Sequence, residues 1–395
     1  MSNFRELLKQ AKAQVGEVEP EQVKARLDGT SPLRLLDVRE EEETANGIVP
    51  GAATLSRAHF ESRVEDVLPD KAAEVVVYCQ SGVRSVFAAR TLQELGYQNV
   101  TSMRGGFLRW KDLGYPFEVP RSLDRGQRGR YSRHLILPEV GEAGQLRFLN
   151  AKVLCVGAGG LGSPALLYLA AAGIGTIGIV DSDVVEENNL QRQVVHNTER
   201  LGTLKAESAK ATIEALNPDV NVVVHPLRLD ATNARDVLAG YDVVLDGTDN
   251  FDARYVINDA AVALRIPVIH GSIFRFEGMA STFVPFEGPC YSCLYPEAPP
   301  PELAPSCSEA GVLGVLPGIV GSLQANEVLK LVGGYGEPLV GRLMIFDARS
   351  TRFSEVRVRR DPACPVCGEA AQAAALASET EEPERHLKAA GTPAA

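Results

Sequence analysis

Residues 151–183, AKVLCVGAGGLGSPALLYLAAAGIGTIGIVDSD, decide the fold of the larger part of this 395-residue chain. An apolar run leads into a glycine-rich turn, an Ala- and Leu-rich helical stretch and a second apolar run that ends at Asp181. Gly157 would allow the tight turn, Gly159 would let the backbone approach a phosphate, and Gly162 would let the helix pack on the strand. The stretch therefore predicts a nucleotide site in which Asp181 could bind ribose hydroxyls.

Polar residues farther along the chain indicate which nucleotide chemistry to expect. Taken alone, the glycine turn and Asp181 are typical of a nicotinamide-dependent dehydrogenase. However, Arg192 follows in NNLQRQ, Lys205 opens the helical pattern LKAESAKATIEAL, and the buried strand in DVVLDGTDN leads to Asp249. The cations could neutralise a triphosphate, and the carboxylate could hold Mg²⁺. We therefore favour phosphoryl or nucleotidyl transfer, with an NAD-dependent oxidoreductase carrying an accessory sulfurtransferase domain as the alternative.

A second candidate site surrounds Cys79 in the stretch EVVVYCQSGVRS. The valine run predicts a buried strand, and Cys79 would lie at its carboxyl end, where parallel sheets place their sites. Gly82 permits positive φ in the following loop, the next helix begins with partial positive charge, and Arg84 would add a cation if it turned inward. Such a loop would favour a thiolate or persulfide anion. It fits phosphate-ester hydrolysis or sulfur transfer, and its small size favours sulfur.

The composition divides the chain into four parts. Strand-like and helix-like runs alternate in residues 1–120, which predicts a small α/β domain with a parallel sheet. An Arg- and Gly-rich linker occupies residues 121–130, and a larger α/β domain occupies residues 131–369. Residues 370–395 are rich in Ala, Glu and Pro without apolar periodicity, so we expect a disordered tail.

Charge and hydropathy argue against two classes of partner. The formal net charge of −11 opposes bulk attraction to nucleic acid or an anionic membrane. No apolar run reaches the roughly 20 residues that a transmembrane helix needs. The N-terminal stretch MSNFRELLKQAKAQV lacks the apolar core of a secretion signal. We therefore expect a cytoplasmic protein without nucleic-acid or membrane partners.

The seven cysteines favour metal ligands or catalysis over a disulfide framework, because the number is odd and no export signal is present. Cys290 and Cys293 form one C-x₂-C pair, and Cys364 and Cys367 form another. Four thiolates are the number that a tetrahedral structural Zn²⁺ takes, although the gap between the pairs is long for a compact ribbon. Cys307 follows the proline-rich stretch PEAPPPELAP and is either a nucleophile or an exposed bystander.

The first segment resembles a rhodanese domain. LLDVREEEE, PGA, CQSGVRS and GGFLRW follow the pattern of that family in order, although Ile48 and Val49 stand where the family usually carries a His. We expect Asp37 and Arg39 to form a structural ion pair behind the loop, and Trp110 to be a core residue. The resemblance implies a sulfurtransferase whose persulfide loop consists of Cys79, Gln80, Ser81, Gly82, Val83 and Arg84.

The stretch from RYSRHLILPEVG through DPACPVCG resembles the adenylyltransferases that activate ubiquitin-like sulfur carriers, relatives of the ubiquitin-activating enzymes. VGAGGLGS, NNLQRQ, LGTLKAESA, VLDGTDN, CYSCLYP, SCSEAGVLGV and GSLQANEVLK carry the resemblance. It implies a Rossmann-like domain in which Asp181 binds the ribose, Asp249 binds Mg²⁺, and the two C-x₂-C pairs bind Zn²⁺. It also implies a homodimer in which Arg133 reaches the ATP of the partner subunit. The remaining ATP-binding residues that it implies are Gly159, Gly160, Gly162, Asn189, Arg192 and Lys205.

The two resemblances together imply a joint reaction that uses ATP, Mg²⁺ and Zn²⁺. The C-terminal Gly-Gly carboxylate of a MoaD/ThiS-type sulfur carrier would be adenylylated, with Arg192 and Asp249 as catalytic residues. Cys79, loaded as a persulfide by a cysteine desulfurase or another donor, would then attack the adenylate, and Cys307 would help to release a thiocarboxylate. Molybdopterin, thiamine, transfer-RNA thiolation and cysteine routes all fit. A non-enzymatic scaffold is a further alternative.

Overall fold

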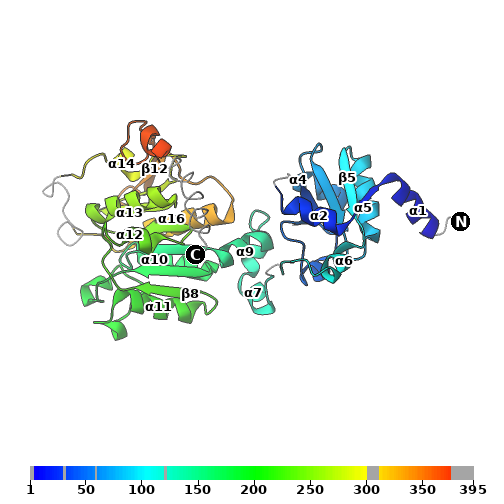
Figure 1. Cartoon of the computed structure of the whole chain (residues 1–395). Coiled ribbons are helices and arrows are strands. Elements are labelled where there is room, and N and C mark those ends of the chain that lie inside the picture. The colour runs from blue at the N-terminus through cyan, green and yellow to red at the C-terminus, as the bar shows by residue number, and fades with distance from the viewer. Residues whose placement is uncertain (1–3, 30–32, 58–59, 120–121, 300–310, 375–395) are drawn as a thin grey trace, which may run out of the picture. The chain divides into compact units, whose positions relative to one another are not determined.

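The computed structural model divides the chain into two compact units, Met1–Ser122 and Leu123–Ala395 (Figure 1). The structure describes all residues except 1–3, 30–32, 58–59, 120–121, 300–310 and 375–395. Within the described part of the chain, no helix combines the length and apolar character needed to cross a membrane.

The first unit is a parallel sheet with helices on both faces, as predicted for this segment (Figure 1). Its strand order is β1-β5-β4-β2-β3, and each neighbouring pair is parallel. The strands are β1 (Gly16–Val18), β2 (Arg34–Asp37), β3 (Ala53–Thr54), β4 (Glu74–Tyr78) and β5 (Asn99–Met103). The helices are α1 (Phe4–Gln14), α2 (Pro20–Leu27), α3 (Glu41–Thr44), α4 (Phe60–Val67), α5 (Val83–Glu94) and α6 (Gly106–Asp112).

Strand β4 shows how the sequence builds the first unit. Val75 and Val77 belong to a core with α1, α4 and α5, whereas Val76 and Tyr78 belong to a core with α2 and α6. Because side chains alternate across a strand, an uninterrupted apolar run is buried on both faces of a central parallel strand. Trp110 is fully buried in the second of these cores, which confirms the prediction that it is a core residue.

The second unit contains a larger mixed sheet in the order β13-β12-β11-β10-β9-β6-β7-β8. The neighbouring strands β8, β7, β6, β9 and β10 pair in parallel. The neighbouring strands β10, β11, β12 and β13 pair antiparallel. The strands are β6 (Lys152–Val156), β7 (Thr176–Val180), β8 (Asn221–His225), β9 (Val243–Asp246), β10 (Val268–Phe274), β11 (Glu277–Phe283), β12 (Arg342–Asp347) and β13 (Arg352–Arg357).

Helices cover both faces of the parallel part of this sheet. One core joins the sheet to α9, α10, α11 and α16, and the other joins it to α12, α13 and α14. Cys155 in β6 is fully buried in the first core, and burial raises the pKa of its thiol. The helices are α7 (Arg125–Arg130), α8 (Ser132–Leu135), α9 (Gly141–Asn150), α10 (Gly162–Ala172), η2 (Glu187–Asn189), η3 (Thr198–Arg200), α11 (Lys205–Leu216), α12 (Ala234–Leu238), α13 (Phe251–Leu264), α14 (Tyr291–Leu294) and α16 (Val315–Gly333).

Two segments that the sequence did not predict as structured contain helical residues. Helix α7 lies within the expected linker at 121–130, and the carboxylate of Asp124 caps it by accepting a hydrogen bond from the backbone N of Gln127 at 2.8 Å. Residues 369–374 are helical, so the predicted disorder from residue 370 is wrong at its start. A side-chain hydrogen bond between Arg360 and Gln372 holds that turn, and residues 375–395 lie outside the described residues.

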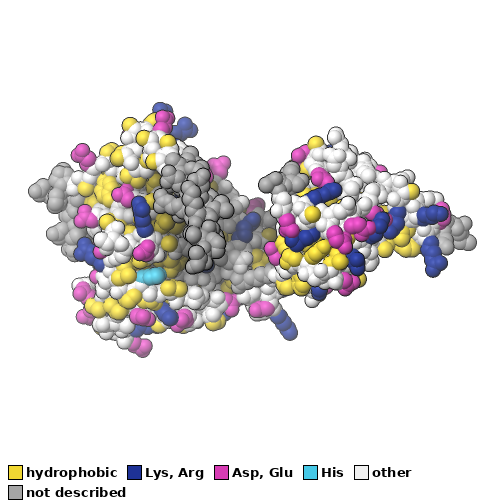
Figure 2. All heavy atoms as spheres, viewed as in Figure 1, with side chains coloured by type: hydrophobic (Ala, Val, Ile, Leu, Met, Phe, Trp, Pro, Cys, Tyr) yellow, Lys and Arg dark blue, Asp and Glu magenta, His cyan; other side chains and the backbone are white. Residues whose placement is uncertain are grey.

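The surface in Figure 2 carries charges of both signs. On the described part of the face shown, Lys and Arg side chains lie among Asp, Glu and apolar side chains in each unit. The negative net charge of the chain is therefore a sum over a mixed surface, and local fields have to be considered site by site.

Candidate functional site

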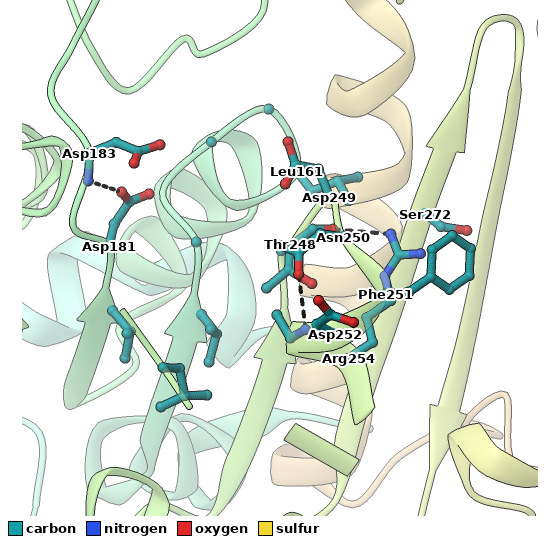
Figure 3. Close-up of a pocket in the computed structure, with 18 of the residues that line it drawn as sticks. Leu161, Asp181, Asp183, Thr248, Asp249, Asn250, Phe251, Asp252, Arg254 and Ser272 are labelled. Carbon is teal, nitrogen blue, oxygen red and sulfur yellow. Dashed lines mark hydrogen bonds between the residues drawn. The ribbon is translucent and has the colours of Figure 1, made fainter. Parts of the chain in front are cut away.

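A cavity of about 830 Å³ opens in the second unit beside the carboxyl ends of β6, β7 and β9 (Figure 3). This is the edge of a parallel sheet at which open α/β folds bind their ligands. Most of the predicted nucleotide-binding residues line it. They are Gly159, Gly160, Asp181, Arg192, Lys205 and Asp249.

The glycine turn after β6 requires glycine for two separate reasons. Gly157 has a φ of 98°, and an added Cβ would lie 2.8 Å from the carbonyl oxygen of Gly247. A Cβ on Gly162 would lie 1.9 Å from the carbonyl oxygen of Gly157. Gly162 is not among the described lining residues of the cavity. Its contacts therefore match the predicted close packing of helix on strand, while its implied ATP contact stays a prediction.

Asp181 fastens the glycine turn to the end of β7. Its carboxylate accepts hydrogen bonds from the backbone N atoms of Ala158 at 2.8 Å and Asp183 at 2.9 Å, and Figure 3 draws the second of these. Burial raises the pKa of Asp181, and these hydrogen bonds and Lys205 act against that rise. The Nζ atom of Lys205 is held 2.8 Å from the Asp183 carboxylate. A ligand in this cavity would therefore meet a cation that already has one acidic partner.

Of three residues predicted to bind ATP, Arg192 lines the cavity, whereas Asn189 and Arg133 are not among its described lining residues. The Nη1 atom of Arg192 donates to the carbonyl oxygen of Asn188 at 3.0 Å, and its side chain reaches the cavity. Asn189 is buried and accepts a hydrogen bond from the backbone N of Glu186 at 3.3 Å, so it supports the loop that carries Arg192. Arg133 is exposed on α8 and is not among the described lining residues of this chain's cavity. Its predicted contact requires a second subunit.

Sequence reasoning missed a buried polar cluster behind the cavity. Asp246 accepts hydrogen bonds from Nδ1 of His270 at 2.8 Å and from the hydroxyl of Thr248 at 2.6 Å. Burial raises the pKa of Asp246, but the hydrogen bond from His270 and the nearby guanidinium of Arg254 outweigh burial and lower it overall. Arg254 lines the cavity and donates to the carbonyl oxygen of Thr248 at 3.1 Å (Figure 3). The histidine inside the apolar run PVIHGS indicates a buried polar contact in the sequence. The sequence does not show which residue is the partner of that histidine.

In the first unit, Cys79 lies directly after β4 and is fully buried. Its loop closes against the start of α6, where the backbone N of Phe107 donates to the carbonyl oxygen of Cys79 at 2.8 Å. The backbone N of Leu108 donates to the carbonyl oxygen of Gln80 at 3.0 Å. A Cβ on Gly106 would lie 2.2 Å from the Cys79 carbonyl oxygen. Gly106 is therefore what allows this close approach.

Two arginines, Arg84 at the end of the Cys79 loop and Arg39 beside the loop, are each paired with a carboxylate. Arg39 and Asp37 form the predicted ion pair, which is buried with a shortest N–O distance of 2.6 Å. Arg39 also donates to the side-chain oxygen of Gln80 at 3.1 Å. Arg84 directs both terminal nitrogens to the carboxylate of Glu43, at 2.6 Å each. The cation that the sequence predicted at Arg84 is therefore shared with Glu43, an acidic residue that the sequence did not single out.

Four cysteines of the second unit form a cluster that could hold a metal ion. Cys290 Sγ lies 3.9 Å from Cys293 Sγ and 3.7 Å from Cys364 Sγ, and Cys293 Sγ lies 3.4 Å from Cys367 Sγ. A tetrahedral ion with Zn–S bonds of about 2.3 Å would place the sulfurs about 3.8 Å apart. Burial raises the pKa of Cys290 and Cys367, an effect that a bound cation would reverse. The remaining predicted thiol, Cys307, lies outside the described residues.

Comparison with known families assigns both units. Residues 131–366 match the sequence model of the ThiF family. The chain belongs to the ThiF family. Residues 19–113 match the sequence model of the Rhodanese-like domain. The two resemblances drawn from the sequence motifs, and the α/β fold they imply, are confirmed.

Curated relatives match more than half of this ThiF-family chain. The SAMP-activating enzyme E1 of Haloferax volcanii is 55% identical over 248 residues, which are 63% of this chain and 92% of the relative. The sulfur carrier protein adenylyltransferase of Thermus thermophilus is 51% identical over 245 residues, 61% of this chain and 90% of the relative. The probable adenylyltransferase/sulfurtransferase MoeZ of Mycobacterium tuberculosis is 52% identical over 252 residues, 63% of this chain and 64% of the relative. These names support the expectation of a sulfur-carrier adenylyltransferase with a sulfurtransferase domain over the nicotinamide alternative.

A solved structure shares its fold with more than half of this chain. The crystal structure of E. coli MccB with ATP aligns with a TM-score of 0.54 and 25% identity, covering 60% of this chain and 74% of that chain. ATP use is thus implied for the ThiF-family unit by its family and by its adenylyltransferase relatives.

Proposed function

We propose that this ThiF-family protein uses ATP to adenylylate the C-terminal Gly-Gly carboxylate of a ubiquitin-like sulfur carrier, and that its rhodanese-like unit supplies the sulfur. The observation that carries the proposal is the cavity in which Arg192, Lys205 and Asp249 meet beside the glycine turn. A nicotinamide site would need the turn and Asp181, but it would leave two cations and a further carboxylate without a role.

The adenylation step makes a poor electrophile reactive. A carboxylate oxygen of the carrier attacks the α-phosphorus of ATP, pyrophosphate leaves, and the product is an acyl-adenylate with AMP as a good leaving group. Arg192 and Lys205 neutralise charge on the phosphates, and the Gly159–Gly160 backbone approaches them. Asp249 would hold Mg²⁺, which supplies further charge neutralisation when bound. In a homodimer, Arg133 would add a cation from the partner subunit.

The sulfur step uses the thiol of the first unit. Once loaded as a persulfide, the terminal sulfur on Cys79 attacks the acyl carbon, and AMP leaves. Cleavage of the resulting acyl disulfide by a second thiol, for which Cys307 is the candidate, releases the thiocarboxylate and leaves a disulfide to be reduced. A cysteine desulfurase is the donor class we propose for loading Cys79, in the cytoplasm. Zn²⁺ at Cys290, Cys293, Cys364 and Cys367 would tie the segment around Cys364 and Cys367 to the segment around Cys290 and Cys293.

Carrier-dependent exchange of radiolabelled pyrophosphate into ATP tests the adenylation step directly. We expect exchange with at least one Gly-Gly-ended carrier of the MoaD/ThiS type, and none when the carrier lacks its terminal glycine. Mg·ATP should also raise the melting temperature of the protein, whereas NAD should not. Stabilisation by NAD but not by Mg·ATP would contradict the proposal, and a folded protein without exchange on any such carrier would favour a scaffold.

A further inference from the structure

The side chains of Glu43 and Arg84 form a two-pronged ion pair beside the Cys79 loop. Both terminal nitrogens of Arg84 lie 2.6 Å from a carboxylate oxygen of Glu43, and the side chains are 36% and 32% exposed. Arg84 lowers the pKa of Glu43, and Glu43 raises the pKa of Arg84, with a smaller contribution from Cys79. Arg84 therefore faces the acidic partner and the thiol together, and the partner is ionised at neutral pH.

The second arginine at the loop is neutralised in the same way. Arg39 contacts Gln80 of the loop, but Asp37 holds the guanidinium with both carboxylate oxygens. The side chains of these two pairs therefore sum to zero charge. The partial positive charge at the start of α5, near half an elementary charge, and the backbone amides of the loop can still attract an anion.

We propose that Glu43 selects the sulfur donor by charge, so that the Cys79 loop accepts sulfur from persulfides with one negative charge and disfavours dianions such as thiosulfate. The inference rests on the proposed role of Cys79 as a sulfur acceptor and adds the class of donor. Glu43 acts through Arg84 and is a positioning residue. Unpaired cations help a dianion to leave its water, and a carboxylate already bound to Arg84 competes with the dianion for that cation and repels it.

The two loading reactions differ in the charge that approaches the loop. With a persulfide, the Cys79 thiolate attacks the outer sulfur of the donor, the donor S–S bond breaks, and the electron pair leaves on the donor thiolate. With thiosulfate, the same attack breaks the S–S bond and expels sulfite, which carries both negative charges away. Both steps give the same Cys79 persulfide. Only the second brings two negative charges toward the thiolate and Glu43.

The test compares two donors on the full-length protein and its Glu43→Gln variant. The donors are thiosulfate and cysteine persulfide, whose net charge is one negative unit, and the readout is the rate at which mass spectrometry detects one added sulfur on Cys79. We expect Glu43→Gln to raise the thiosulfate rate on the order of tenfold and the cysteine persulfide rate only about threefold, because the same change in potential acts on two charges in one donor and on one charge in the other. High salt should shrink the thiosulfate gain, because screening weakens the repulsion that the substitution removes.

Two further variants separate charge from structure. Glu43→Asp keeps the negative charge and should retain the wild-type preference. Glu65→Gln changes net charge equally but removes an ion pair with Lys71 that does not involve the loop, so neither donor rate should change. Equal gains for both donors, or a gain in Glu43→Asp equal to that in Glu43→Gln, would overturn the inference. If neither donor loads Cys79 in the wild type or in any variant, the sulfur-accepting role itself would be contradicted.

Discussion

The Nε2 atom of His196 lies 2.9 Å from the carbonyl oxygen of Ala158, and its Nδ1 lies 3.0 Å from the hydroxyl of Ser208. The backbone N of the same Ala158 donates to Asp181. The glycine turn is thus held from one side by a carboxylate and from the other by an imidazole. Burial lowers the pKa of His196 to about 4, so the ring is neutral at neutral pH, with Nε2–H donating and Nδ1 accepting.

We expect acid to destabilise the second unit through His196. Below pH 6.5 the unfolded chain protonates this residue, but the folded chain does so only near pH 4, so the unfolded state binds more protons in that window. The free energy of unfolding should therefore fall as pH falls. At about 1.4 kcal/mol per pKa unit, the full shift corresponds to roughly 3 kcal/mol.

Urea unfolding of the wild type and His196→Gln at several pH values measures this contribution. Gln can donate to the Ala158 carbonyl but does not titrate, and all other titrating groups are common to both proteins. The difference in unfolding free energy between the two should narrow between pH 6.5 and pH 4. A difference that stays constant across this range would show that His196 does not titrate as its burial requires.

The glycine turn also predicts a sharp contrast between two glycine substitutions. Gly162→Ala would place a methyl carbon 1.9 Å from the Gly157 carbonyl oxygen, so the turn has to move or the unit fails to fold. We expect a loss of at least about 3 kcal/mol in the unfolding free energy of the second unit. Gly318→Ala in α16 is the matched control, because an added Cβ there meets no atom within 4 Å. It should be neutral or stabilising by up to about 1 kcal/mol. Similar unfolding curves for the two variants would contradict the packing argument.

These cases show what the sequence could and could not predict. The strand–turn–helix unit and Gly162 follow from local sterics, because their contacts lie within a few residues of each other. Glu43 and Arg84 are 41 residues apart, and nothing in the stretch EEEET shows which acid meets the loop. The same holds for Asp246 and His270 on neighbouring strands, whose pairing depends on sheet register. Residues that act through a tertiary partner were therefore missed, whereas residues that shape the backbone were found.

The four-cysteine cluster should hold one metal ion that stabilises the second unit. Cys364→Ser removes one sulfur of the cluster, and we expect the purified protein to lose its bound zinc and to melt at a lower temperature. Cys155→Ser is the control, because Cys155 lies in the core around β6 and not in the cluster. It should lower stability without changing the metal content. Equal zinc content in Cys364→Ser and the wild type would rule out this cluster as the metal site.

Adenylation in the second unit and sulfur loading in the first unit should be lost independently when Asp249 or Cys79 is replaced. Asp249→Ala removes the proposed Mg²⁺ ligand, so pyrophosphate exchange should fall by about two to three orders of magnitude while persulfide loading of Cys79 is unchanged. Cys79→Ala should abolish loading and leave carrier-dependent exchange intact, because exchange needs only the carrier carboxylate and ATP. Both activities are measured on the same protein preparations.

Asp252→Ala tests whether pyrophosphate exchange needs a carboxylate at the position of Asp249 or only negative charge in the cavity. Asp252 also lines the cavity, three residues beyond Asp249 at the start of α13. If Asp249 binds the metal, Asp252→Ala should keep exchange within a few-fold of the wild type, and the exchange of Asp249→Ala should not recover at high Mg²⁺. Matching losses in the two variants would mean that the cavity needs negative charge in general, and the assignment of Asp249 would then be wrong. Loss of both activities in Asp249→Ala would contradict the separation of adenylation from sulfur loading, since Cys79 lies in the other unit.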